Sequence, residues 1–294
     1  MSSIENIALG TEHAQVTRAK QRKYGQWIVS ALIILLGLTL VNSLWNNPRL
    51  RVDIIAEYLF SPLVLKGVLV TIELTIIVFF FGVVLGLGLA LMSQARNPTL
   101  RSFAWGVTWV FRALPPLLQL IIWAFLAALY PQLSLTIPFL DITLFSVDTN
   151  LVMKPYVAAV ICFTLIEMAY QSEAIRAGLQ SVASTQIEAA QALGYSKWQT
   201  LTRIIVPQAM PAMLAPSVNN LIILLKGTSI VSVIGATELL TTVQNVYAET
   251  YQIIPMLIVA GIWYMILTSI LMLVQRYLEK RYTRGRIAAG GERG

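Results

Sequence analysis

Three ionisable residues, Arg112, Glu167 and Lys226, occupy the interior of long apolar segments. A charge inside such a segment is costly, so these side chains face a protein interior or a watery path and are candidates for function. A carboxylate at Glu167 is suited to bind an ammonium group or another cation. An internal ion pair of Glu167 with Arg112 or Lys226 explains the same pattern, and the sequence leaves both interpretations open.

Two further carboxylates, Glu73 and Glu173, lie nearer the ends of apolar segments. Glu167 and Glu173 are separated by about one and two-thirds turns of a helix, so their side chains point to different faces. Glu173 and Arg176 lie together at the cytoplasmic end of the same apolar segment. We therefore interpret Glu173 and Arg176 as gate or loop-anchoring residues and treat Glu167 separately.

The residues needed for most enzymatic and metal chemistry are missing. The chain has one cysteine, Cys162, and one histidine, which excludes an intrachain disulfide and a Cys/His metal cluster. The phosphate-binding pattern G-x-x-x-x-G-K-[ST] is absent, because Lys226-Gly-Thr-Ser has the wrong order. We therefore expect no enzymatic activity and no cofactor bound by this chain.

The segments that carry these residues are long and apolar. The 294 residues are 57% hydrophobic and 12% charged, which is typical of an integral membrane protein. A bilayer-spanning helix needs about 20 predominantly apolar residues. The segments that are long enough lie at 27–45, 64–92, 103–130, 156–174, 210–234 and 255–275. The sequence thus predicts an all-α integral membrane protein with six transmembrane helices.

The distribution of basic residues predicts the orientation in the membrane. With the N-terminus inside, 15 of the 21 Lys and Arg residues fall in cytoplasmic segments, while Arg49, Arg51, Lys66 and Lys154 lie outside. The positive-inside rule therefore favours both termini in the cytoplasm. Because the basic residues are dispersed and form no stripe, the net charge of +7 reflects this topology, and we expect no nucleic-acid partner.

Three connections lie outside in this topology, at about 46–63, 131–155 and 235–254. The prolines and aspartates of the middle connection fit a solvated connector as well as a docking surface. Inside the second span, Gly82 and Gly86 form a small-xxx-small pair, which predicts close packing against another helix.

The longest cytoplasmic connection, about 175–209, has the pattern of two helices joined by a turn. Thr185 and Glu188 fit a capping box at the start of the first helix, and Gly194 fits a left-handed residue at its end. Ser196 and Gln199 fit a second capping box, which opens a helix expected to end at Pro207.

The first of these helices has two interpretations. Ile187, Ala190 and Leu193 fall near one face, where the small alanine allows another surface to approach closely. The face suits docking into a groove, but Glu188 and Gly194 can equally serve only as cap and turn. The spacing of these residues alone leaves both interpretations open.

A longer pattern favours docking. Glu188-Ala189-Ala190, three residues, Gly194, nine residues and Ile204-Ile205-Val206-Pro207 resemble the EAA motif, EAA-x3-G-x9-I-x-L-P, with Val206 in place of Leu. This motif characterises permease subunits of binding-protein-dependent ABC importers. In that family the short helix docks on the ATP-binding subunit and couples it to the membrane helices.

Four other stretches are similar to the polar amino acid permeases of that family, which transport histidine, glutamate, glutamine, arginine or opines. They are GVLVTIELT (67–75), FRALPPLLQL (111–120), AYQSEAIRAG (169–178) and LLKGTSIVSVIGATEL (224–239). Ala113, Leu114 and Gly227 depart from the family pattern, which puts any polar role at those positions in doubt.

The resemblance covers 61–280, the expected five-helix core with the coupling loop 175–209. It leaves a cytoplasmic N-terminal tail (1–26), an extra transmembrane helix with an outer loop (27–60) and a basic cytoplasmic tail (281–294). The resemblance thus divides the chain into the family core and three flanking parts.

The resemblance implies a permease subunit of an ATP-driven amino acid importer in the bacterial inner membrane. The residues it assigns to coupling are Thr185, Glu188, Ala189, Ala190, Gly194, Ile204 and Pro207. The residues that we expect along a substrate path or gate are Arg112, Gln119, Glu167, Tyr170, Glu173 and Lys226.

The implied partners are a pair of ATP-binding subunits that carry ATP and Mg²⁺, a second permease subunit of the same or a related kind, an external solute-binding protein, an amino acid and membrane lipid. An ion-coupled secondary transporter is the alternative. It leaves the EAA loop without a purpose, and the sequence has no visible inverted repeat.

Overall fold

The computed structural model describes residues 24–137 and 142–290 and divides the chain into two compact units. The first unit ends at Leu50, and its described elements are helix α1 (Tyr24–Trp45) and the short helix η1 (Pro48–Leu50). Trp27 and Trp45 lie exposed at the two ends of α1, as expected for interfacial anchors of a membrane span.

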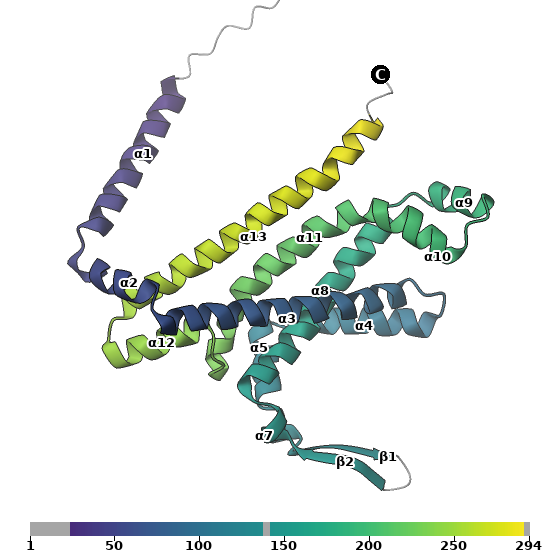
Figure 1. Cartoon of the computed structure of the whole chain (residues 1–294), viewed down its shortest axis with the longest axis horizontal. Coiled ribbons are helices and arrows are strands. Elements are labelled where there is room, and N and C mark those ends of the chain that lie inside the picture. The colour runs from purple at the N-terminus through teal and green to yellow at the C-terminus, as the bar shows by residue number, and fades with distance from the viewer. Residues whose placement is uncertain (1–23, 138–141, 291–294) are drawn as a thin grey trace, which may run out of the picture. The chain divides into compact units, whose positions relative to one another are not determined.

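The second unit, residues 51–294, is a bundle of long helices centred on α8 (Pro155–Gln180). This helix packs against α3 (Pro62–Ser93), α4 (Pro98–Ala113), α5 (Pro116–Ala124) and α11 (Val206–Gly227). Helix α13 (Ile253–Gly290) packs along α11 (Figure 1) and continues well past the predicted end of the sixth span at 275.

The glycine pair predicted to pack closely does so between α3 and α8. A Cβ atom added at Gly82 would lie 2.6 Å from Cγ of Glu167, and one at Gly86 would lie 2.9 Å from Cβ of Gln171. Because neither position has room for a side chain, the two helices approach closely along this line.

The predicted third span, 103–130, is wrong as one straight helix. It is divided into α4, α5 and the short α6 (Leu126–Leu129), and α4 and α5 meet at an angle of 99°. Pro115 causes the break because proline restricts the preceding residue to extended conformations, and Leu114 has φ −85° and ψ 138°. In the described residues, five helices are therefore long and apolar enough to span a membrane, or six if this bent pair counts as one span.

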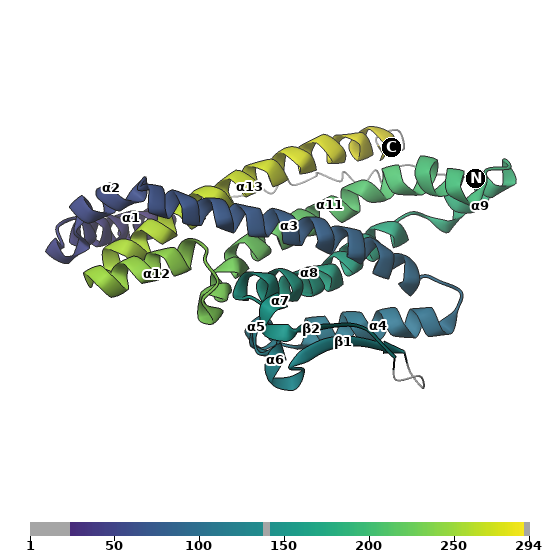
Figure 2. The same cartoon turned by 60° about the horizontal axis from the view of Figure 1, so that its bottom comes forward.

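The connections on one side of the bundle are more structured than the sequence predicted. Helix α2 (Val52–Leu59) lies in the first connection, and α12 (Leu239–Thr250) occupies most of the third. Figures 1 and 2 both place these helices at the end of the unit opposite to α9 (Ser184–Ala192) and α10 (Lys197–Thr200).

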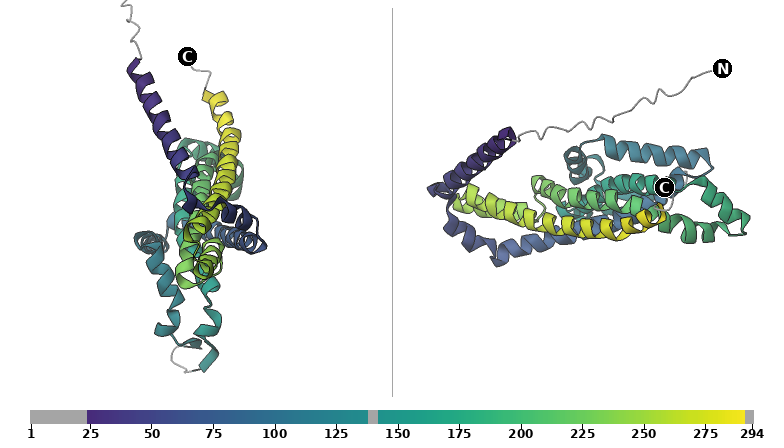
Figure 3. Two further views of the ribbon diagram at one scale, coloured as in Figure 1. Left: turned by 90° about the vertical axis from the view of Figure 1, so that its left-hand side faces the viewer. Right: turned by 90° about the horizontal axis from the view of Figure 1, so that it is seen from above.

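The middle connection contains an antiparallel ribbon of β1 (Gln132–Ile137) and β2 (Ile142–Asp148), followed by α7 (Thr149–Val152). An all-α prediction misses this ribbon. Leu135 pairs with Phe145 and Leu133 with Val147, which places these four apolar side chains on one face. The ribbon stands apart from the packed helices (Figures 1 and 3), so this face is largely uncovered within the chain.

Candidate functional site

Helix α9, which carries the EAA sequence, begins two residues earlier than its capping pattern predicts, with Ala183 and not Thr185 as the N-cap. Ala183 is the N-cap residue and makes no side-chain cap bond, so the predicted capping box of Thr185 and Glu188 is wrong. Thr185 instead lies inside the first turn, too late in the helix to be the cap. Glu188 is exposed and therefore free to contact a partner.

The end of α9 agrees with the prediction for Gly194. This glycine has φ +82°, and its N–H donates to the carbonyl of Gln191 (3.0 Å), while the N–H of Tyr195 donates to the carbonyl of Ala190 (3.1 Å). These two bonds form a Schellman motif. A Cβ atom at Gly194 would meet nothing within 4 Å, so the requirement for glycine here is one of backbone conformation.

The helix after this turn begins as predicted and ends later than predicted. Ser196 and Gln199 form the second capping box, with bonds of 3.3 Å and 2.9 Å. The helix does not end at Pro207, because a π-helical turn at Leu201–Ile205 precedes it and the N–H of Val206 bonds to the carbonyl of Leu201. α10, the π turn and α11 therefore form one helical rod that connects the loop to the membrane core.

Two large apolar side chains are exposed on this loop. Leu193 is 80% exposed and Trp198 is 71% exposed, while Ala190 is buried. The predicted common face of Ile187, Ala190 and Leu193 is therefore divided, because Leu193 lies at the C-cap of the helix. Exposed apolar residues grouped on a loop mark a contact surface. No sequence motif indicated Trp198 as part of this surface.

Inside the bundle, Glu167 is buried and faces a small cavity between α8 and α11. The carboxylate is 4% exposed and accepts a 2.7 Å hydrogen bond from Nε2 of Gln171, which also donates to the carbonyl of Ser217. The cavity has a volume of about 210 Å³, and Glu167, Tyr170 and Asn220 are the polar side chains in an otherwise apolar lining.

No ion pair to Glu167 occurs among the described residues. The alternative that Glu167 pairs with Arg112 or Lys226 is therefore wrong for this conformation. Arg112 contacts Glu173 instead, and Lys226 lies exposed on α11. The Glu167 carboxylate thus keeps capacity for a further partner on its cavity side.

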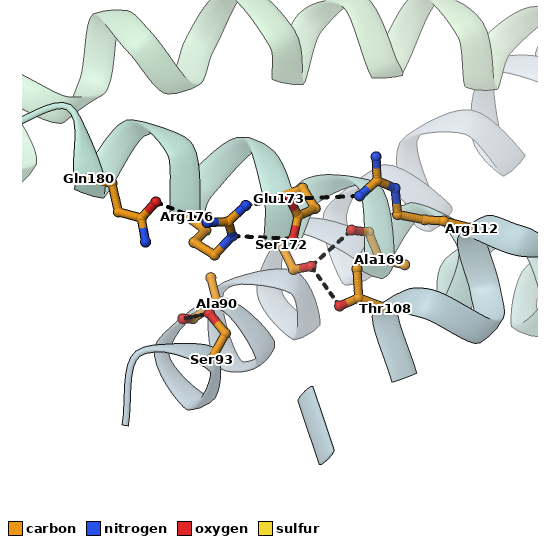
Figure 4. Close-up of polar contacts among 9 residues, drawn as sticks. All are labelled: Ala90, Ser93, Thr108, Arg112, Ala169, Ser172, Glu173, Arg176 and Gln180. Atoms are coloured by element: carbon orange, nitrogen blue, oxygen red, sulfur yellow. Dashed lines mark hydrogen bonds and ion pairs between the residues drawn. The ribbon is translucent and has the colours of Figure 1, made fainter. Parts of the chain in front are cut away.

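A second polar group joins α8 to α4 (Figure 4). Arg176 donates to both oxygens of Glu173, at 3.2 and 2.7 Å, and Nη1 of Arg112 lies 3.7 Å from Oε2 of the same carboxylate. The guanidinium of Arg112 also lies over the ring of Tyr170, 5.4 Å from its centroid. Glu173 therefore forms ion pairs with Arg176 of its own helix and with Arg112 of α4.

This group borders a larger open cavity of about 680 Å³. Its lining combines Arg101, Arg112 and Arg176 with the stacked rings of Trp105 and Trp109. Tyr170 lines both this cavity and the smaller one beside Glu167. Tyr170 therefore stands between the two spaces, as expected of a residue at a gate or path.

Gln119 has a different position from the one its assignment to the path suggests. Its side chain is 3% exposed, and its Nε2 donates to the carbonyls of Phe111 (3.0 Å) and Leu114 (2.9 Å). These carbonyls flank the break between α4 and α5, so Gln119 holds the bend and lines neither of the two cavities.

Glu238 is a further buried carboxylate, which was not among the residues predicted from the sequence. It is 0% exposed at the start of α12 and accepts hydrogen bonds from the N–H of Thr241 (2.8 Å), the hydroxyl of Tyr264 (2.7 Å) and the hydroxyl of Thr71 (3.3 Å). Glu238 thereby joins α12 to α3 and α13. The position of Glu238 just before an apolar helix was the available signal, since carboxylates are common N-caps.

Comparisons with known proteins agree with this architecture. Residues 82–284 match the family model of the binding-protein-dependent transport system inner membrane component. The arginine transport system permease protein of Corynebacterium glutamicum is 38% identical over 90% of this chain and 82% of its own length. The glutamate/aspartate import permease protein of Escherichia coli is 31% identical over 75% of this chain and 93% of its own.

Among solved structures, that of an amino acid ABC transporter with histidines superposes with a TM-score of 0.63 and 29% identity, covering 76% of this chain and 95% of that one. The inward-facing methionine transporter MetNI shares the fold, with a TM-score of 0.59 and 19% identity over 75% of this chain and 96% of that one. This chain belongs to the binding-protein-dependent transport system inner membrane components.

It is a permease subunit of an ABC importer, and the ATP-hydrolysing subunit of such an importer is a separate chain. Membership in this family implies that the chain works with ATPase subunits, a permease partner and a solute-binding protein.

Proposed function

We propose that this permease carries amino acids with a free ammonium group, cationic or zwitterionic, along a path past Glu167 and Tyr170. The observation that carries the proposal is the buried Glu167 carboxylate, which has no ion-pair partner among the described residues and faces a cavity. A desolvated carboxylate binds an ammonium or guanidinium group far better than it binds an anion. The names of the relatives, which include arginine and glutamine permeases, support the same class.

The proposed assembly contains two permease subunits, two ATPase subunits that hold ATP and Mg²⁺, and an external solute-binding protein. The larger cavity beside Tyr170 is open at the surface of the chain, which supports a second permease subunit that completes the path. Both termini lie in the cytoplasm in this proposal, because most of the basic residues then lie inside.

Coupling to the ATPase is assigned to α9 and the rod that follows it. The exposed Glu188, Leu193 and Trp198 form the docking surface. Because α10, the π turn and α11 are continuous, a displacement of the loop is transmitted to the part of α11 that lines the Glu167 cavity.

Reconstitution tests this function against the ion-coupled alternative. Proteoliposomes that contain the permease, its ATPase and the binding protein should take up radiolabelled arginine, glutamine or another amino acid only when ATP is present. Uptake by the permease alone, driven by an ion gradient and without an ATPase, would contradict the proposal.

A charge reversal tests the coupling surface. Glu188→Lys should leave the protein inserted in the membrane but abolish ATP-dependent uptake and co-purification with the ATPase. Gln186→Lys places a lysine at another exposed position of the same helix, outside the EAA sequence, with a charge change of +1 against +2 for Glu188→Lys, and serves as the control. Normal uptake and normal co-purification of the Glu188→Lys variant would refute the docking role.

A further inference from the structure

Gln171 of α8 contacts both the buried Glu167 carboxylate and helix α11. Its Nε2 atom donates to Oε1 of Glu167 at 2.7 Å, within α8, and to the backbone carbonyl of Ser217 at 3.3 Å, across to α11. No other hydrogen bond and no ion pair joins α8 to α11 in the part of the chain that the structure describes. The polar link between these two helices is therefore also a contact of the carboxylate on the proposed substrate path.

On both sides of this link, α8 and α11 meet through apolar contacts. Toward the start of α8, Phe163 and Leu224 of α11 belong to one buried apolar cluster. Toward its end, Gly178 approaches α11 so closely that an added Cβ atom would lie 2.0 Å from Cγ of Met213. Apolar packing does not respond to the charge of a carboxylate. The amide of Gln171 is the part of this contact that does.

The side chain of Gln171 is held in place behind Glu167. It is 0% exposed and lines neither of the cavities beside Tyr170. A Cβ atom added at Gly86 of α3 would lie 2.9 Å from Cβ of Gln171, so α3 fixes the base of the side chain. A substrate in the smaller cavity would therefore contact Glu167 and act on Gln171 only through that carboxylate.

The orientation of the Gln171 amide depends on the charge of Glu167. Oε1 of Gln171 is buried and has no hydrogen-bond partner among the described residues. A buried acceptor without a donor is unfavourable, whereas a hydrogen bond to a charged acceptor is stronger than one to a neutral acceptor. The carboxylate charge thus favours this orientation despite the unpaired oxygen. An ammonium group bound to Glu167 offsets that charge and weakens the preference.

The carbonyl that Gln171 contacts lies where α11 is least stiff. Ser217 directly follows Pro216, and Pro211 lies about one and two-thirds turns before Ser217. Each proline lacks the N–H that would bond to the preceding turn, so a helix bends most readily at such positions. Beyond these prolines the same rod continues through the π turn to the coupling loop. Gln171 therefore holds α11 at the edge of its most bendable part.

We propose that Gln171 is a positioning residue that relays occupancy of the Glu167 cavity to the coupling loop through its hydrogen bond to α11. The proposal rests on the proposed function, which places an ammonium group of the substrate on Glu167. With the cavity empty, the amide holds α11 against α8. With an ammonium group on the carboxylate, this hold weakens and α11 bends at its prolines, so ATP hydrolysis responds to the substrate.

The experiment uses the reconstituted importer and measures ATP hydrolysis with and without the amino acid that supports uptake, beginning with arginine. Gln171→Met nearly keeps the length of the side chain and removes both hydrogen bonds. It should retain basal hydrolysis and show an amino-acid-dependent increase that is about two- to tenfold smaller, the equivalent of one hydrogen bond. The variant should still bind the radiolabelled amino acid, because Glu167 is intact.

Thr164→Val is the matched control. Thr164 is a buried residue of the same helix, and its hydroxyl has no hydrogen-bond partner among the described residues. The substitution removes a buried polar atom of similar size without breaking a bond between helices, so hydrolysis should respond to the amino acid as in the wild type. A merely structural role of Gln171 would instead lower the unfolding midpoint and reduce basal and stimulated hydrolysis together, which would overturn the relay.

A second variant and a second measurement keep the test valid if Gln171→Met does not accumulate. Gln171→Asn retains the amide but is one methylene too short to reach both acceptors, and it should show the same loss of stimulation. Hydrogen–deuterium exchange of residues 206–217 should change on addition of saturating amino acid to the wild type, and should not change in either Gln171 variant.

The outcomes separate this proposal from the proposed function. Wild-type stimulation in both Gln171 variants, together with reduced uptake by Glu167→Gln, would overturn the relay and leave the proposed function intact. Normal uptake by Glu167→Gln would overturn the proposed function and the relay with it.

Discussion

Glu167 and Glu238 are two buried carboxylates in the same bundle, yet their surroundings differ completely. Glu238 accepts bonds from a backbone N–H and from the hydroxyls of Thr71 and Tyr264, and it lines neither of the two cavities beside Tyr170. Glu167 accepts one bond from Gln171 and faces a cavity. Burial alone therefore does not distinguish a structural carboxylate from one that is available to a ligand.

The difference lies in where the hydrogen-bond donors come from. Around Glu238 they belong to three elements, so the carboxylate holds α3, α12 and α13 together. Around Glu167 the donor is on the same helix, so the bond orients the carboxylate without joining elements. We therefore expect Glu238 to matter for folding and Glu167 to matter for transport, and three substitutions test this contrast, ordered by their effect on the free energy of unfolding.

Glu238→Ala should have the largest effect. It leaves up to three buried donors without an acceptor, and each costs about 1–3 kcal/mol of unfolding free energy. Thermal unfolding of the purified permease in detergent should show a strongly lowered midpoint or a protein that does not accumulate. Tyr264→Phe removes one of the donors and should cost only about 1 kcal/mol. Equal unfolding midpoints for the wild type and Glu238→Ala would show that Glu238 has no structural role.

Gly82→Ala should lower the free energy of unfolding by an intermediate amount, and it should also disturb Glu167, which packs against Gly82 of α3. Its added methyl group would lie 2.6 Å from Cγ of Glu167, so α3 and α8 must separate or the carboxylate must move. Overpacking of this kind costs about 1–3 kcal/mol. Gly88→Ala is the matched control, because a Cβ atom there meets nothing within 4 Å. A midpoint no lower for Gly82→Ala than for Gly88→Ala would argue against the close approach.

Glu167→Gln should have the smallest effect on stability and a large effect on transport. The amide oxygen can still accept the bond from Gln171, so the unfolding midpoint should stay within the equivalent of about 0.5 kcal/mol. Loss of a charge-assisted hydrogen bond to the substrate is worth about 1.5–3 kcal/mol, which corresponds to a ten- to hundredfold lower uptake at low substrate concentration. Normal uptake by the Glu167→Gln variant, combined with a lowered unfolding midpoint, would show that Glu167 serves stability and not transport.

Local features of the coupling loop were predictable where a few neighbouring residues suffice. Gly194 ends α9 in the left-handed conformation, and Ser196 with Gln199 caps the next helix, because these bonds stay within one or two turns. The same S/T-x-x-E/Q pattern failed at Thr185, since a capping box also requires that the helix start at that residue. The pattern alone does not specify the start.

The apolar segments were predictable in number but not in shape. Five of them form continuous helical stretches, while the segment around Pro115 breaks by 99°. Proline at this position permits a break, but Pro207, Pro211 and Pro216 lie in a helix that continues through them. The effect of a proline on a helix depends on which groups satisfy the carbonyls that lose their backbone hydrogen bond. At the break near Pro115 the side chain of Gln119 donates to the free carbonyls, whereas before Pro207 a π turn lets the helix continue.

The amino-acid sequence by itself determined that the chain crosses a membrane, which family it resembles and where the coupling loop turns, because composition, spacing and caps act over short distances. Only the tertiary structure decided that the Glu238 carboxylate has its hydrogen bonds satisfied by three elements, while the Glu167 carboxylate faces a cavity and is available to a ligand. Glu238 finds Thr71 more than half the chain away, and Tyr156 of α8 reaches Glu73 of α3 only because these two helices pack together. Hydrogen bonds and charges act between neighbours in space, and packing of the helices creates those neighbours.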